Sequence, residues 1–384
     1  MTRVAVTPDL LTWARDRAGM DPLDLQHRFP KLALWETGEA QPTLKQLEGF
    51  ARAVHVPVGY LFLPGPPDEP LPIPDFRTVE GRALSRPSPN LLDMVYACQE
   101  RQGWYREFAL ATRQKEADFV GSASLSARPE EVAAAIARTL AFDLDARAAC
   151  RTWEDALRLF ILQADQIGIL VMVSGVVLSN NSRTLDPEEF RGFALADRRA
   201  PLVFINGADS KAGQMFTLAH ELAHLWLDSS AVSNASAAPL SGYRREEVWC
   251  NAVAAELLVP LDALRPALER GEELPAALQR LARRFKVSTL VILRRLLDAG
   301  WLSRARFDAA WREERDRLRE LAGTAGGGGD FYRTTLSRVS RRFARALVES
   351  TLEGQTLYRD AFRMLGVAKT ETFNQIGREV GVML

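Results

Sequence analysis

The segment His220-Glu221-Leu222-Ala223-His224 constrains this chain more than any other feature of its sequence. Residues four apart lie on one face of an α-helix, with Cβ atoms about 5–6 Å apart, so both imidazoles can reach a single metal ion. The surrounding residues 216–227 are mostly apolar on all sides. A buried helix must give its polar groups partners, because burying them unpaired is costly. A metal ion would satisfy the three polar side chains, and the alternative is a pair of satisfied core histidines.

This spacing indicates a catalytic zinc site. Zinc binds neutral imidazole nitrogens at about 2.0–2.1 Å and keeps one position open for water when the site is catalytic. Glu221 lies between the histidines, where its carboxylate can take a proton from that water. We therefore expect Zn²⁺ bound by His220 and His224, with Glu221 as the general base.

A third ligand is required, and elimination makes it acidic. The chain has 4 histidines, and the remaining two, His27 and His55, lie in the N-terminal part. The next predicted helix offers several acids, and one more follows His224 directly. These candidates are Glu246, Glu247, Glu256 and Asp228.

Helical spacing favours Glu247 among these acids. It is four residues before Asn251, and the rest of that helix is mostly apolar, so the two side chains can face inward together. Glu246 can be solvated at the start of the helix, and Asp228 and Glu256 remain alternatives. Asn251 either supports a metal ligand by a hydrogen bond or is an ordinary packing or capping amide.

A longer pattern surrounds these residues. It comprises Phe-Thr-Leu-Ala-His-Glu-Leu-Ala-His at 216–224, then Glu247-x-x-x-Asn251-x-x-Ala-Ala-Glu-Leu-Leu-Val-Pro260, and an apolar stretch at 202–206. The pattern resembles the ImmA/IrrE family of bacterial metallo-endopeptidases over residues 157–295. The resemblance implies a gluzincin-like zinc peptidase with His220, His224 and a downstream glutamate as ligands. In the family pattern the glutamate four residues before the asparagine is the ligand, which again favours Glu247.

The resemblance also implies a function. It suggests hydrolysis of a peptide bond in a specific protein, of the transcriptional repressor or antitoxin type known from phage immunity and stress responses. An oxyanion donor is expected as well, for which Tyr243 is a candidate, although it is equally well an ordinary surface tyrosine. The competing hypothesis is a DNA-binding regulator or toxin–antitoxin component whose peptidase fold is mainly an interaction scaffold.

The N-terminal residues 10–61 carry a second pattern, in which Trp35-Glu36-Thr37-Gly38 precedes Pro42, Leu44, Leu47, Ala51 and Val56. It resembles the second half of an XRE-type (lambda-repressor-like) helix-turn-helix module. The segment 29–34 is about four residues too short for the helix that would enter the major groove. Residues 1–64 contain seven basic and seven acidic side chains, so little charge is available for phosphate neutralisation. This unit therefore either binds DNA or has a protein-docking or purely structural role.

Proline and glycine divide the chain. Eight of its 20 prolines lie between positions 64 and 89, which favours extended chain, either a linker or a strap across the next domain. The predicted parts are a helix-turn-helix unit (1–63), a Pro-rich linker (64–90), a helical lead-in with the zinc peptidase domain (91–325, core 157–295) and a helical C-terminal cap (330–384). The predicted fold class is α+β and mostly helical, with a zincin-like small sheet beside the His-Glu-x-x-His helix.

Periodicity predicts the elements within these parts. Short strands are expected at 167–173, 190–195 and 201–206, and helices at 91–112, 130–142, 215–227, 246–258, 274–285 and 290–299. Residues 229–242 are predicted to be a surface loop and 326–329 a flexible joint. The Arg-rich C-terminal helices fit solvated basic faces, and a basic patch for nucleic acid or an acidic partner is the alternative.

Composition indicates which classes of partner and which cellular compartment to expect for this protein. The 49 basic and 49 acidic residues balance, which argues against a general polyanion binder. Three cysteines without CxxC spacing cannot form a disulfide framework. The chain shows no signal peptide and no stretch long enough to span a membrane, so we expect a cytoplasmic protein with a protein substrate and no membrane partner.

Overall fold

The computed structural model describes residues 3–79, 82–83, 86–233, 244–322 and 331–382. The chain forms two compact units, the first comprising Met1–Pro72 with Ser85–Asp93 and the second Ile73–Leu84 with Met94–Leu384. The predicted joint at 326–329, most of the predicted loop at 229–242 and Tyr243 lie outside the described residues. No helix within the described part has the length and apolar character needed to cross a bilayer.

The first unit is helical. Its elements are α1 (Pro8–Arg17), α2 (Pro22–Arg28), α3 (Leu32–Glu36), α4 (Leu44–Ala53) and the 3₁₀ helix η1 (Val58–Phe62). Trp35 and Phe50 are buried in its core, and Arg15 of α1 donates two hydrogen bonds to the carboxylate of Glu36. The helix expected to read DNA is α3, which has five residues. The assignment of this unit as a helix-turn-helix module stays a prediction.

The second unit is built on a four-stranded sheet with the order β3-β7-β6-β8. Strands β3 (Leu170–Ser174) and β7 (Leu202–Asn206) are parallel, whereas β6 (Gly192–Leu195) runs antiparallel to β7 and to β8 (Ala231–Ser233). All residues of these four strands are buried, as expected for a sheet covered on both faces.

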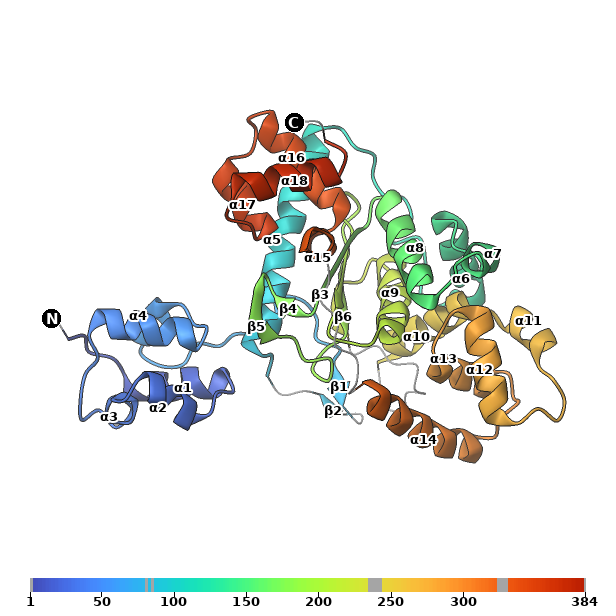
Figure 1. The fold of residues 1–384 in the computed structure, drawn as a ribbon, viewed down its shortest axis with the longest axis horizontal. Helices are drawn as coiled ribbons and strands as arrows, with labels where there is room; N and C mark the ends of the chain where they lie inside the picture. The colour runs from blue at the N-terminus through green and yellow to red at the C-terminus, as the bar shows by residue number, and fades with distance from the viewer. Residues whose placement is uncertain (1–2, 80–81, 84–85, 234–243, 323–330, 383–384) are drawn as a thin grey trace. The chain divides into compact units, whose positions relative to one another are not determined.

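Helices cover the two faces of this sheet (Figure 1). On one side lie α8 (Trp153–Gln166), α9 (Lys211–Trp226) and α10 (Arg245–Leu258), with α9 packed on β6 and β7. On the other side α15 (Phe331–Val339) packs on β3 and carries α16 (Arg341–Leu352), α17 (Tyr358–Leu365) and α18 (Thr370–Glu379). The expectation of a mostly helical α+β chain with a small sheet is confirmed.

The structure has further helices and strands outside these layers. They are β1 (Thr78–Val79), β2 (Arg82–Ala83), α5 (Pro89–Ala111), α6 (Pro129–Leu140), α7 (Leu144–Ala148), β4 (Val176–Val177), β5 (Asn180–Thr184), α11 (Leu261–Leu264), η2 (Arg265–Ala267), α12 (Leu274–Phe285), α13 (Thr289–Asp298) and α14 (Arg304–Ala322).

Two expectations need correction. Residues 231–233 were expected in a surface loop, yet they form the edge strand β8, because their backbone pairs with β6 in the buried sheet. The Pro-rich segment is also not a linker throughout its length. The backbone N–H of Phe76 donates to the carbonyl of Val232, and the N–H of Val232 donates to the carbonyl of Pro74. Residues 74–76 thus form a strap along β8, which is the second of the two arrangements that the prolines allow.

Candidate metal centre

Helix α9 places the His-Glu-x-x-His residues in the core. Ser210 caps its start by accepting a hydrogen bond from the N–H of Gly213. His220, Glu221 and His224 all have 0% of their surface exposed. The apolar surface around the whole of α9, which lies between β6 and α10, is what allows complete burial of these polar side chains.

Three potential ligand side chains converge between α9 and α10. Nε2 of His220 and Nε2 of His224 are 3.1 Å apart. Oε1 of Glu247 lies 3.0 Å from Nε2 of His224, and Oε2 lies 3.4 Å from Nε2 of His220. The three side chains are buried and form a group that could hold a metal ion.

These separations match the size of a metal ion. A tetrahedral zinc site with bonds of about 2.0–2.1 Å has ligand atoms about 3.3 Å apart. The two imidazole nitrogens are 3.1 Å apart, and each lies 3.0 to 3.4 Å from one of the two oxygens of Glu247, so the three side chains are close enough to share one ion. Two neutral imidazoles and one carboxylate are also the donor types that a divalent transition metal prefers, so the residues fit such an ion.

Asn251 and Glu246 lie beside the Nδ1 atoms of the two histidines, on the side of each ring opposite Nε2. Nδ1 of His220 donates to Oδ1 of Asn251 over 3.0 Å, which leaves the Nε2 lone pair directed at the ligand group. Oε1 of Glu246 lies 3.6 Å from Nδ1 of His224. Glu246 is therefore more than a solvated helix-start residue, and the nearby imidazole of His224 holds the pKa of its carboxyl below the usual value.

Glu247 is ionised at neutral pH. Burial alone would raise the pKa of its carboxyl, but the charge and hydrogen bonds of His220 and His224 outweigh that effect and hold the pKa at about 2. The group thus offers an anionic oxygen to a cation.

Glu221 faces the same space from α9. Its Oε1 accepts a hydrogen bond from the hydroxyl of Ser233, which is fully buried on β8. Its Oε2 is buried and has no hydrogen-bond partner among the described residues. Burial raises the pKa of this carboxyl, and His220, His224 and Ser233 offset only part of the effect. A basic carboxylate oxygen without a partner is suited to accept a proton.

Gly192 makes this approach possible. A Cβ at this position of β6 would lie 2.5 Å from Cγ2 of Thr217 and 3.1 Å from Oε1 of Glu221. Any side chain here would push α9 away from the sheet, and with it Glu221 away from Ser233.

The strap brings further side chains to the site. The Phe76 ring lies 6.1 Å from the imidazole of His224, and the guanidinium of Arg244 lies 4.6 Å from the Phe76 ring. Arg77 is buried and forms ion pairs with Asp75 and Glu189. Sequence reasoning did not find Phe76, Ser233 or the role of Glu246, since no local spacing links them to the His-Glu-x-x-His helix.

The other candidate ligands lie elsewhere. Asp228 is exposed after the end of α9. Glu256 forms a buried ion pair with Arg295 and accepts a hydrogen bond from the N–H of Leu261 over 3.1 Å. The structure therefore brings Glu247, and neither of these two acids, to the histidines.

Comparison with known proteins finds a family match over this region. Residues 164–297 match the family Peptidase_M78, described as the IrrE N-terminal-like domain. The match extends from the end of α8 through the sheet, α9 and α10 to α13, and it supports a metallopeptidase-family protein of the ImmA/IrrE kind with a metal cofactor. Residues 339–379 match DUF8813, a domain of unknown function. No curated protein matches the chain.

Proposed function

We propose that this protein is a zinc-dependent metallo-endopeptidase that cuts a specific protein substrate, a transcriptional repressor or antitoxin-like regulator. The convergence of His220, His224 and Glu247 carries the proposal, together with a carboxylate oxygen of Glu221 that has no hydrogen-bond partner among the residues described. The family match supports the peptidase class. The type of substrate rests on the resemblance to the ImmA/IrrE family.

Each residue of the site has its own role in the proposed reaction. His220, His224 and Glu247 would hold the Zn²⁺, which supplies a Lewis acid for the peptide carbonyl and lowers the pKa of its water. Oε2 of Glu221 accepts a proton from the attacking water and later delivers it to the leaving amine. Ser233 keeps Oε1 of the same carboxylate in place, and Asn251 holds His220 in the tautomer with a free Nε2.

The first experiment measures metal content and cleavage with the full chain. We expect about one zinc per chain, lost in His220→Ala and kept in His27→Ala, whose histidine is exposed on α2. Incubation with the repressor-type protein encoded next to this gene should yield a fragment that Glu221→Gln or a chelator abolishes. Glu130→Gln, an exposed substitution on α6, should leave the fragment unchanged.

The competing hypothesis of a DNA-binding regulator predicts a different outcome. It requires that Glu221→Gln leave every cellular effect intact while changes on the surface of the first unit abolish them. Trp35 is unsuitable for that test, because its side chain is 2% exposed and its removal would disrupt the core of the unit. Lys31→Glu, which changes an exposed residue just before α3, is the better variant.

A further inference from the structure

A second concave site lies in the second unit, away from the metal centre. Its volume is about 720 Å³, and its wall is formed by the C-terminal part of α5, residues 112–117, the turns at 167–168 and 198–201, and α16. None of the His220, Glu221, His224 or Glu247 side chains lines it. Typical small-molecule sites measure about 300–1,000 Å³, so the cavity has the size to hold one.

The wall of this cavity is strongly basic. Two acidic side chains, Glu116 and Glu349, line it against five basic ones, an excess of three positive charges in a chain that is neutral as a whole. The basic residues come from three distant parts of the sequence: Lys115, Arg198, Arg199, Arg342 and Arg345. Only the fold brings them together, and the Arg-rich pattern of the C-terminal helices shows just one of these parts.

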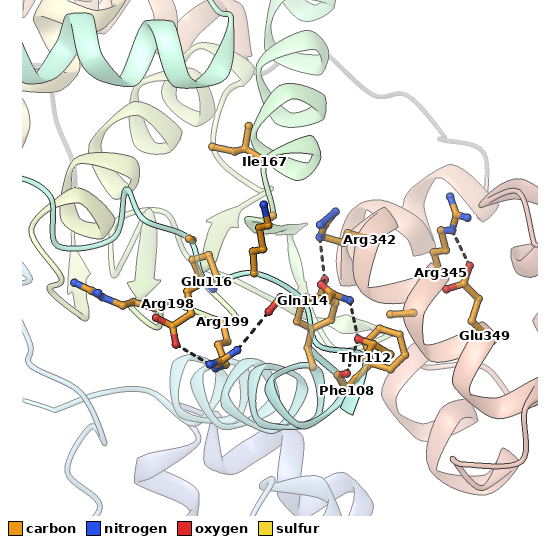
Figure 2. A pocket seen from close by; sticks show the side chains of 16 residues that line it. Phe108, Thr112, Gln114, Glu116, Ile167, Arg198, Arg199, Arg342, Arg345 and Glu349 are labelled. Carbon is orange, nitrogen blue, oxygen red and sulfur yellow. Dashed lines mark hydrogen bonds and ion pairs between the residues drawn. The ribbon is translucent and has the colours of Figure 1, made fainter. Parts of the chain in front are cut away.

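The two acids neutralise only part of this charge. Glu116 forms an ion pair with Arg199 over 2.8 Å, and Glu349 accepts from Nε of Arg345 over 2.8 Å. Figure 2 shows both pairs and the side chain of Arg198 extending away from Arg342. Within the part of the chain that the structure describes, Lys115 and Arg342 have no ion pair with a carboxylate.

Hydrogen bonds fix the orientation of Arg342 in the wall of the cavity. Its Nε donates to the hydroxyl of Tyr105 over 2.9 Å, and that hydroxyl donates to Oε1 of Gln114 over 3.0 Å. The backbone N–H of Arg342 donates to Asp165, which fixes the start of α16. Tyr105 is a neutral partner and is 2% exposed, so it orients the guanidinium without cancelling its charge. The remaining guanidinium N–H groups can bind an anion in a planar, bidentate manner.

Part of the wall is apolar. Phe108, Ile167 and Ala346 line the same cavity as the basic groups. Phosphate is the anion that such a combination of arginine and lysine binds best, and the apolar wall offers contacts to an attached organic group. We propose that this cavity binds a phosphorylated small molecule of nucleotide size, with Lys115, Arg199 and Arg342 on its phosphates.

Such a ligand would connect two parts of the second unit. Arg342 belongs to α16, which packs on β3 and α8, whereas Arg199 lies just before β7, the strand beside β3. Phosphates bound by both would fasten the C-terminal helices to the sheet and stabilise the folded chain by mass action. The inference does not depend on peptidase activity.

The test is calorimetric titration of the full-length protein with ATP and, separately, with inorganic pyrophosphate. We expect saturable binding at one site and a rise of the unfolding temperature. Lys115→Gln removes an exposed side chain that has no ion pair within the described ranges, so it should fold normally and lower the affinity about 10-fold or more. Arg342→Gln should do the same. Arg359→Gln, on the exposed surface of α17, is the matched control and should bind like the wild type.

Three outcomes would overturn the proposal. The first is no binding of either probe at millimolar concentration. The second is equal affinity in Lys115→Gln and the wild type. The third is binding of a single-stranded oligonucleotide that depends on Lys115 while ATP and pyrophosphate do not bind, which would assign the basic surface to nucleic acid instead. Loss of cleavage in Glu221→Gln would leave all three measurements unaffected.

Discussion

The hydroxyl of Ser233 donates a hydrogen bond to Oε1 of Glu221, although one residue lies on the edge strand β8 and the other in the middle of helix α9. The contact uses one carboxylate oxygen and leaves Oε2 without a partner among the described residues. The contact therefore leaves Oε2 as the oxygen of Glu221 that can accept a proton.

Ser233→Ala should slow peptide cleavage and leave metal content unchanged. Hydrogen bonds to charged groups contribute about 1.5–3 kcal/mol, which corresponds to a loss of roughly 10- to 100-fold in rate. Cleavage rate and zinc content measured on the same sample test this. Ser122→Ala, at an exposed position, is the control. An unchanged rate would show that Ser233 does not position Glu221.

Glu247→Gln and Glu256→Gln should change different properties, the first metal binding and the second stability, although both replace an acid on α10. Glu247→Gln removes a proposed ligand and should weaken metal binding by more than the roughly 10- to 100-fold that outer partners contribute. Glu256→Gln should keep the metal and lower the unfolding temperature, because it breaks a buried ion pair with Arg295 worth about 3–5 kcal/mol when one partner is lost. Metal loss in Glu256→Gln with retention in Glu247→Gln would reverse the assignment.

Asn251→Ala should weaken metal binding about 10- to 100-fold, because Nδ1 of His220 loses its acceptor and the imidazole is no longer held in one tautomer. Asn251→Asp keeps an acceptor oxygen at the same place and should retain most of the affinity. Competition with a zinc chelator measures both. Equal affinities in Asn251→Ala and the wild type would make the amide a packing residue only.

Metal uptake should release protons at pH 7. Burial by itself lowers the pKa of His224, but the neighbouring side chains of Cys250, Glu246 and Glu247 raise it well above its usual value. The metal-free imidazole should therefore hold a larger share of a proton at pH 7 than a histidine with an ordinary pKa, which would be only about a quarter protonated. Since a metal binds the neutral imidazole, its affinity should fall as the pH is lowered.

Calorimetry of metal binding in buffers of different ionisation enthalpy counts the released protons. We expect His224 to release clearly more at pH 7 than the roughly one quarter of a proton that a histidine with an ordinary pKa gives up. Glu246→Gln removes one of the groups that raise this pKa and should reduce the number released at pH 7. Release of about a quarter of a proton or less at pH 7 would contradict the raised pKa.

The sequence by itself determined the chemistry of the centre. Two histidines four residues apart on an apolar helix place the candidate site on one face of that helix, and the lack of further nearby histidines favoured an acidic group as the third member. Helix boundaries followed from periodicity within a few residues, and α12 occupies the predicted range 274–285. The run of short strands followed by helices in the middle of the chain also predicted an α+β chain correctly.

Only the tertiary structure decided which acid completes the group and what supports it. Glu247 and Glu256 are nine residues apart, about 180° around the helix, so one of them at most can face the histidines. Periodicity cannot tell which, because both faces of α10 are buried, one against α9 and the other toward Arg295. The pairing of β8 with β6 brings Ser233 to Glu221, and the packing of α16 brings Arg342 to the same cavity as Lys115. Such placements depend on contacts between segments distant in the chain, which no local pattern of residues encodes.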